Sequence, residues 1–161
     1  EQLLRDVDWQ ELDILIIDMP PGTGDAQLTL SQRVQLAGAI IVSTPQDLSL
    51  IDARKGLNMF KKVNVPILGI IENMSYFLCT KCDTKHPIFG NGGAKIEAEK
   101  LGVPFLGEVP LDITLRITSD EGNPIMIKEP EHLISKVYME IASQIITSIT
   151  ADTRKSPVII Q

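Results

Sequence analysis

Two cysteines separated by two residues are the clearest sign of chemistry in the chain. Cys79 and Cys82 lie in the segment CTKCDTKH, which also contains His86. This spacing brings two thiolates within reach of one metal centre, but a structural zinc or a cubane iron–sulfur cluster needs about four ligands. A symmetric dimer would supply four thiolates. Four interpretations stay open from these residues alone: a shared cluster, a zinc site using His86, a redox pair, and a surface pair without function.

A second group of candidates follows an apolar run near the start of the chain. Residues 12–18 read LDILIID, and residues 18–25 read DMPPGTGD. An acid at the carboxyl end of a buried strand, here Asp18, can hold Mg²⁺ through water beside a bound nucleotide. Gly22 and Gly24 allow the backbone to approach a phosphate closely. The simpler alternative is a tight strand-to-helix turn with Asp25 as the helix cap.

These residues need a scaffold, and the pattern of apolar residues predicts one. Short apolar runs alternate with amphipathic stretches, which is typical of βα units around a mostly parallel sheet. The expected strands are residues 12–18, 38–44, 66–73 and 105–109. The expected helices are residues 25–36, 48–63, 93–101 with a stop at Gly102, and 130–150. Residues 74–92 show no periodicity, and loops of this length in a compact domain are usually functional.

The composition limits the classes of partner. The 161 residues are enough for one domain, which we expect to span residues 1–150, with 151–161 as a flexible tail. A net charge of −6 argues against nucleic acid, which requires clustered lysine and arginine. No apolar run approaches the roughly 20 residues of a membrane span. Two cysteines make no disulfide framework and indicate a reducing compartment, the cytoplasm or alternatively the mitochondrial matrix.

Five blocks of sequence, taken together and in order, resemble the Mrp family. The blocks are LDILIIDMPPGTGDAQLTLSQ, STPQDLSLIDARKGL, GIIENMSYFLCTKC, HPIFGNGGA and LGEVPLDITLR, and the resemblance runs from about residue 9 to residue 150. These proteins are iron–sulfur cluster carriers and deviant P-loop ATPases, related to the nitrogenase iron protein and to the Min and Par ATPases. The resemblance implies an α/β fold: a doubly wound, mostly parallel sheet with helices on both faces.

The resemblance also implies roles for the acid and the glycine near the start. Asp18 matches the Walker B acid, expected near Mg²⁺, and Gly22 matches a switch glycine whose N–H senses the γ-phosphate. The family's Walker A loop has the form GKGGVGKS, and this sequence contains no such loop. The pair considered as a match, Gly92 and Gly93, is followed by Ala and Lys without a hydroxyl residue. We therefore expect a C-terminal part of a longer ATPase. This part alone is expected to bind ATP weakly and not to hydrolyse it.

Further positions match the family's contacts to the adenine base. Asn73 stands where relatives use an asparagine to bind adenine. Pro110 and Asp112 would flank the base on its other side, and Arg116 would lie near the ring.

The function implied is iron–sulfur cluster transfer. Cys79 and Cys82 would bind a 4Fe–4S cluster at a homodimer interface, and the cluster would pass to apoproteins. ATP with Mg²⁺ would gate this transfer in the intact protein. Neither a nucleic acid nor a membrane is an expected partner. The alternatives are a Min-like or Par-like positioning ATPase, which does not need the two cysteines, and a zinc-stapled structural dimer.

Overall fold

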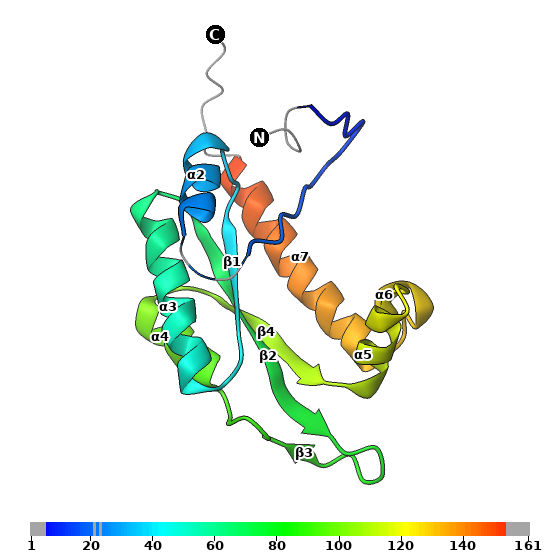
Figure 1. Cartoon of the computed structure of the whole chain (residues 1–161). Helices are drawn as coiled ribbons and strands as arrows, with labels where there is room; N and C mark the ends of the chain where they lie inside the picture. The colour runs from blue at the N-terminus through cyan, green and yellow to red at the C-terminus, as the bar shows by residue number, and fades with distance from the viewer. Residues whose placement is uncertain (1–5, 21, 23, 154–161) are drawn as a thin grey trace.

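The chain folds into a four-stranded sheet with helices on both faces, as a computed structural model shows for residues 6–20, 22 and 24–153 (Figure 1). The strands are β1 (Ala39–Ser43), β2 (Ile67–Leu78), β3 (Lys85–His86) and β4 (Phe105–Leu111). The helices are α2 (Asp25–Arg33), α3 (Asp47–Lys62), α4 (Gly93–Leu101), α5 (Ile113–Asp120), α6 (Ile125–Lys128) and α7 (Leu133–Thr153).

The sheet is mostly parallel, as predicted. β2 is central: it pairs in parallel with β1 and with β4, while the short β3 pairs with it antiparallel. The carboxyl ends of the three parallel strands therefore meet at one edge, at the bottom of the sheet in Figure 1. This is the edge at which open α/β sheets bind ligands.

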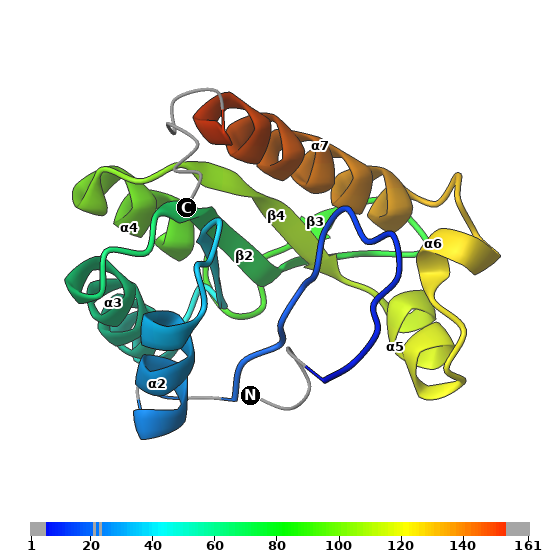
Figure 2. The same cartoon turned by 90° about the horizontal axis from the view of Figure 1, so that it is seen from above.

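Side chains of successive residues in the parallel strands pack into two separate hydrophobic cores, one on each face of the sheet. Ile41 and Ile70 face α3 and α4, where they pack with Leu50, Leu57 and Ala98. On the opposite face, Leu106, Val109 and Ile141 form the second core, in which α7 covers β4. Figure 2 shows these layers from above, with α3 and α4 on one side of the sheet and α7 on the other. The period-2 alternation of a strand buried on both faces produces this arrangement.

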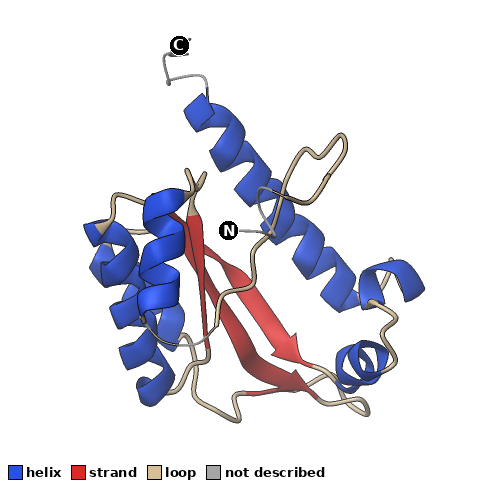
Figure 3. Ribbon diagram, turned by 45° about the horizontal axis from the view of Figure 1, so that its top comes forward, coloured by secondary structure: helices blue, strands red, loops and turns tan. Residues whose placement is uncertain are grey.

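The prediction of a strand at residues 12–18 is wrong. These residues form an irregular coil, visible as the tan segment beside α7 in Figure 3, and Ile16 is 85 % exposed. An apolar run becomes a strand only when a neighbouring strand satisfies its backbone hydrogen bonds. No strand pairs with it among the described residues.

The segment 74–92, predicted to lack regular structure, is in large part a β-hairpin. β2 continues to Leu78, and after a turn β3 returns along it, with Phe77 opposite His86. Met74 has a positive φ of 54°, and the pairing of β2 with β4 is irregular between Asn73 and Phe77. This bulge interrupts the pairing of β2 with β4, which resumes at Phe77 opposite Leu111, where the hairpin begins.

The helices differ from prediction mainly at their ends. α4 stops at Gly102 in the left-handed conformation, as predicted (φ 65°). The cap of α2 is Gly24 rather than Asp25, and α5 and α6 were not predicted. α7 continues to Thr153, so the first three residues of the tail expected at 151–161 are helical, and residues 154–161 lie outside the described part. No described helix is long and apolar enough to cross a bilayer.

Candidate functional site at the carboxyl edge of the sheet

A pocket of about 450 Å³ opens where β1 and β2 end beside α3. It is lined by Pro20, Gly22, Ile40, Ile41, Val42, Ser43, Thr44, Ser49, Asp52, Ala53, Gly56 and Asn73. Two of the predicted nucleotide contacts, Gly22 and Asn73, therefore share one cavity although they are far apart in sequence. Asp18 is exposed and does not line this pocket.

The turn that carries Gly22 is held by a glutamine that sequence reasoning missed. Gln27 in α2 is 4 % exposed, and its Nε2 donates to the carbonyl oxygens of Pro20 (2.9 Å) and Gly22 (3.3 Å). Gly22 has a φ of +96°, which only glycine adopts without strain. Gln27 therefore fixes which way this turn faces the pocket. Its position in the first turn after DMPPGTG was the available signal.

The predicted adenine contacts lie on neighbouring strands. Asn73 on β2 pairs with Val109 on β4, so Pro110 follows directly beside it. The Oδ1 of Asn73 accepts a hydrogen bond from the backbone N–H of Met74 at 3.0 Å. The structure thus brings Asn73 and Pro110 together at the end of the sheet.

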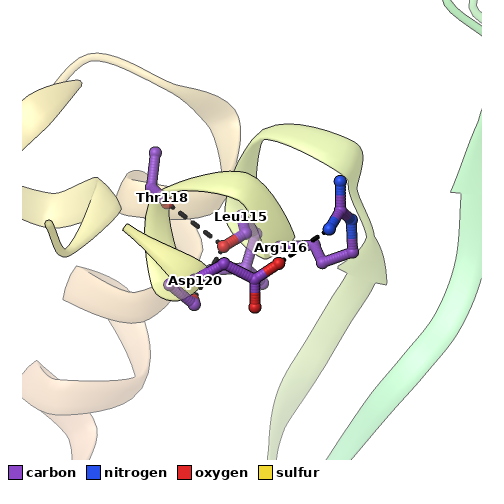
Figure 4. A network of polar contacts seen from close by, with 5 residues as sticks. Leu115, Arg116, Thr118 and Asp120 are labelled. Carbon is purple, nitrogen blue, oxygen red and sulfur yellow. Dashed lines mark hydrogen bonds and ion pairs between the residues drawn. The ribbon is translucent and has the colours of Figure 1, made fainter. Parts of the chain in front are cut away.

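Asp112 and Arg116 already have structural partners in α5. The Oδ1 of Asp112 accepts from the N–H of Leu115 at 3.0 Å, which makes Asp112 the helix cap. Figure 4 shows the guanidinium of Arg116 directed at the carboxylate of Asp120, at 2.7 Å. Both side chains of that ion pair are 67 % exposed, so solvent screens the pair and leaves Arg116 free to rearrange.

Cys79 and Cys82 lie at the tip of the β2–β3 hairpin. The N–H of Cys79 donates to the carbonyl of Thr84 (3.0 Å), and the N–H of Asp83 donates to the carbonyl of Cys79 (2.9 Å). This turn puts Asp83 at a φ of +56°. Cys79 is half-buried and Cys82 is exposed, and neither is in a disulfide. The hairpin therefore holds both thiols at one accessible point.

Thr84 was not predicted, yet it acts directly on the thiol chemistry. Its Oγ1 lies 3.2 Å from the Sγ of Cys82. Hydrogen bonding from the side chain and backbone of Thr84, and then from Cys79, lowers the pKa of Cys82. A lower pKa increases the thiolate fraction, which is the form that binds iron or zinc.

His86 does not complete a metal site with the two cysteines. Within the part of the chain that the structure describes, no three side chains of His, Cys, Asp or Glu gather closely enough to hold a metal ion. His86 instead sits opposite Phe77 in the hairpin ladder. The described chain thus offers two thiolates at this point and no third ligand.

Comparisons with known proteins identify the family of the chain. A model of the family described as "ParA: NUBPL iron-transfer P-loop NTPase" matches residues 1–146. The iron-sulfur cluster transfer protein NUBPL of Dictyostelium discoideum is 55 % identical over 149 residues, covering 92 % of this chain and 46 % of that protein. The iron-sulfur cluster carrier protein of Haemophilus influenzae is 49 % identical over 148 residues, covering 92 % of this chain and 40 % of that protein.

Solved structures show the same fold. A nucleotide-binding protein from Archaeoglobus fulgidus, in complex with ADP, matches with a TM-score of 0.70 and 42 % identity, over 81 % of this chain and 53 % of that one. The cell division ATPase MinD of Pyrococcus furiosus matches with a TM-score of 0.53 and 25 % identity, over 69 % of this chain and 43 % of that one. The chain spans about half the length of the curated relatives it matches. Since the family model covers residues 1–146 of 161, the chain belongs to the ParA family, in its NUBPL iron-transfer group of P-loop NTPases.

Proposed function

We propose that this protein carries an iron–sulfur cluster and transfers it to apoproteins, with Cys79 and Cys82 as the cluster ligands. The observation that carries the proposal is the position of both thiols at the tip of the β2–β3 hairpin, where Cys82 is exposed. Relatives at 55 % and 49 % identity are named as iron–sulfur cluster transfer and carrier proteins. The cluster is the cargo here, so ligands at an accessible tip suit its uptake and release.

The number of ligands supports a cluster shared by two copies of the chain. A 4Fe–4S cluster needs about four thiolates, and each described chain presents two. A two-fold axis through the cluster would supply the other two from the partner. Each copy would then hold the cluster by two bonds, so a small separation of the copies would release it.

Nucleotide binding at the same edge would gate this transfer. Asn73, Pro110, Asp112 and Arg116 would contact the base, and Gly22 would face the γ-phosphate. Asp18 would hold Mg²⁺, which offsets phosphate charge when bound. Support comes from the pocket that Gly22 and Asn73 share and from the ADP complex of the Archaeoglobus relative. β2 runs from Asn73 to the hairpin, so a ligand that prefers one position of this strand would shift the position of the thiols.

A second function is favoured by one observation. The match to MinD supports a positioning ATPase, whose mechanism has no use for a cysteine pair. The carrier function requires both cysteines, whereas a positioning ATPase requires neither.

The proposed location is the cytoplasm or the mitochondrial matrix, since an Arabidopsis thaliana relative at 47 % identity is named as mitochondrial and required for NADH dehydrogenase.

The test replaces each cysteine in the full-length protein. After anaerobic reconstitution with iron and sulfide, the unchanged protein should show a broad thiolate-to-iron absorption band and about four irons per two chains. Cys79→Ala and Cys82→Ala should each abolish the band and cluster-dependent dimerisation, because two or three ligands do not hold the cluster. ATP binding should survive in both.

Lys81→Ala is the matched control, since Lys81 is exposed between the two cysteines. It should keep the band and the iron content. A Cys79→Ala protein that retains its cluster would contradict the proposed function.

A further inference from the structure

The segment that carries the cysteines starts and ends at one buried carboxylate. Glu72 on β2 is fully buried (0 % exposed). Its Oε1 accepts a hydrogen bond from the Oγ of Ser75 at 2.6 Å, and its Oε2 accepts one from the N–H of Ala94 at 2.7 Å. Ser75 lies in the bulge of β2, between Asn73 and Phe77, and Ala94 lies in the first turn of α4, where the chain returns. The whole excursion between them is therefore attached at both ends to a single side chain.

At the returning end, Glu72 acts as a helix cap for α4. The N-cap of α4 is Gly92, at a φ of 66°, and the first turn of α4 contains no acidic residue. The free N–H groups at a helix start need acceptors, and negative charge there is favourable. A carboxylate from the sheet supplies both. The position of α4 thus depends on a residue of β2 that is 22 positions away.

At the departing end, the Glu72–Ser75 bond spans the bulge in β2. Met74 adopts a φ of 54°, a left-handed conformation that is uncommon for a residue other than glycine. Ser75 is 1 % exposed, so water does not compete for its hydroxyl. Hydrogen bonds in such a dry environment are stronger than on the surface. The bond therefore stabilises the bulge that immediately precedes the hairpin.

We propose that Glu72 is a positioning residue for Cys79 and Cys82. It contacts neither thiol, but it fixes both ends of the hairpin segment and so determines where the thiols stand relative to the sheet and to a second copy. This inference rests on the proposed cluster-carrier function. Glu72 and its two hydrogen bonds lie directly next to Asn73 in β2. The strand end proposed to bind the base and the cysteine hairpin are therefore held by the same carboxylate.

A second buried carboxylate supplies the contrast. Glu97 in α4 is 4 % exposed and pairs with Arg54 of α3, with the Arg54 Nη2 to Glu97 Oε2 distance at 2.8 Å and a second bond from Nε to Oε1. This ion pair lowers the pKa of Glu97. It joins α3 to α4 and contacts no residue of the hairpin. Glu97→Gln therefore makes the same substitution at a similarly buried carboxylate that pairs with an arginine of α3 instead of holding the hairpin segment.

The experiment compares four variants of the full-length protein: Glu72→Gln, Ser75→Ala, Ser75→Thr and Glu97→Gln. Two quantities are measured: the rate at which an iron chelator removes the reconstituted cluster, and the rate at which iodoacetamide alkylates each cysteine in the cluster-free protein. A glutamine can accept through only one atom, so Glu72→Gln leaves one donor without its acceptor. We expect cluster loss to accelerate, but by less than the roughly tenfold that follows loss of a residue hydrogen-bonded to a metal ligand, because Glu72 contacts neither thiol.

Alkylation of Cys79, which is half-buried in the intact turn, should also accelerate in Glu72→Gln. Ser75→Ala should shift both rates in the same direction by less, and Ser75→Thr should restore them because it returns the hydroxyl. Glu97→Gln should lower the unfolding temperature while both rates stay unchanged. If Glu72→Gln does not fold, Ser75→Ala and its rescue by Ser75→Thr decide the question.

The outcomes separate the two proposals. Equal rates in the unchanged protein, Glu72→Gln and Ser75→Ala would overturn the positioning role and leave the carrier function standing. The same holds if Glu97→Gln changes the rates as much as Glu72→Gln, since the effect would then be general loss of stability. A cluster that survives Cys79→Ala overturns the carrier function itself, and the alkylation rates do not enter that result.

Discussion

Two residues proposed to lie near the adenine base also stabilise the helix that follows. Asp112 caps α5 through Leu115, and Arg116 pairs with Asp120 one turn further along. A residue with both a structural and a binding role gives an ambiguous result when it is replaced by alanine. At Asp112 the ambiguity can be removed, because asparagine caps a helix about as well as aspartate.

We predict different outcomes for the two substitutions at Asp112. Asp112→Ala should lower the free energy of unfolding by about 1 kcal/mol, the usual cost of losing a helix cap. In a urea titration, the free energy of unfolding of Asp112→Asn should lie within a few tenths of a kcal/mol of the value for the unchanged protein. If the carboxylate contacts nucleotide, calorimetry should show weaker ADP binding in Asp112→Asn despite its normal stability. Unchanged ADP affinity in that variant would remove Asp112 from the proposed site.

At this scale, motifs predicted the residues whose types carry chemistry and missed the residues that position them. Cys79 and Cys82 stood out through their spacing, Gly22 through the run DMPPGTGD, and Asn73 through the resemblance to the Mrp family. The structure places Gly22 and Asn73 in one pocket. Their assigned roles remain predictions. Gln27 and Glu72 were missed because they act through contacts with carbonyl or N–H groups elsewhere in the fold. Glu72 reaches Ala94 only once β2 and α4 have packed together.

The packing of α4 against α3 depends on one glycine. A Cβ at Gly93, the first residue of α4, would lie 2.6 Å from the carbonyl oxygen of Pro45 and 3.0 Å from the Cδ1 of Leu50. The backbone oxygen cannot move aside as a flexible side chain could. Glycine at this position therefore lets the start of α4 approach α3 closely enough for Ala94 to reach Glu72.

Gly93→Ala should consequently destabilise the fold. The added methyl group must push α4 away, and overpacking of this kind typically costs about 1–3 kcal/mol in the free energy of unfolding. Gly56→Ala is the control within α3, where the new methyl group meets no atom within 4 Å. That variant should gain up to about 1 kcal/mol from helix propensity. Urea titrations of both variants test the pair, and a Gly93→Ala protein as stable as the unchanged one would show that α4 is not tightly seated.

Among the elements, those with strong periodicity were predicted well. The strands at 38–44 and 66–73, and the helices at 48–63 and 93–101, match β1, β2, α3 and α4 within a few residues, apart from the extension of β2 to Leu78. That extension was missed because its partner, β3, is only Lys85–His86. Pairing between strands is a non-local contact that a single short segment does not reveal. The apolar run at 12–18 is the opposite case. Its sequence pattern predicts a strand, but no strand among the described residues pairs with it.

In the molecule as a whole, the pocket and the cysteine hairpin lie at the same edge of the sheet and are joined by β2. The hairpin continues the strand that carries Asn73, and Glu72 ties that strand to α4. In the proposed function, a change at the pocket would reach the thiols through this strand and this carboxylate. The resemblance to the Mrp family and the mostly parallel, doubly covered sheet were both predicted from the sequence and are confirmed. The shared cluster and its gating by ATP stay proposals.

Native mass spectrometry of the full-length protein, reconstituted anaerobically with iron and sulfide, distinguishes a cluster shared by two chains from a cluster held by one. We expect a species of two chains with one 4Fe–4S cluster, which a chelator converts into metal-free single chains. Each chain presents two thiolates and no third ligand in its described part, so a single chain should not retain the cluster. A cluster bound to one chain alone would rule out the shared cluster. So would native protein with stoichiometric zinc that iron does not displace, which would identify the cysteine pair as a structural zinc staple.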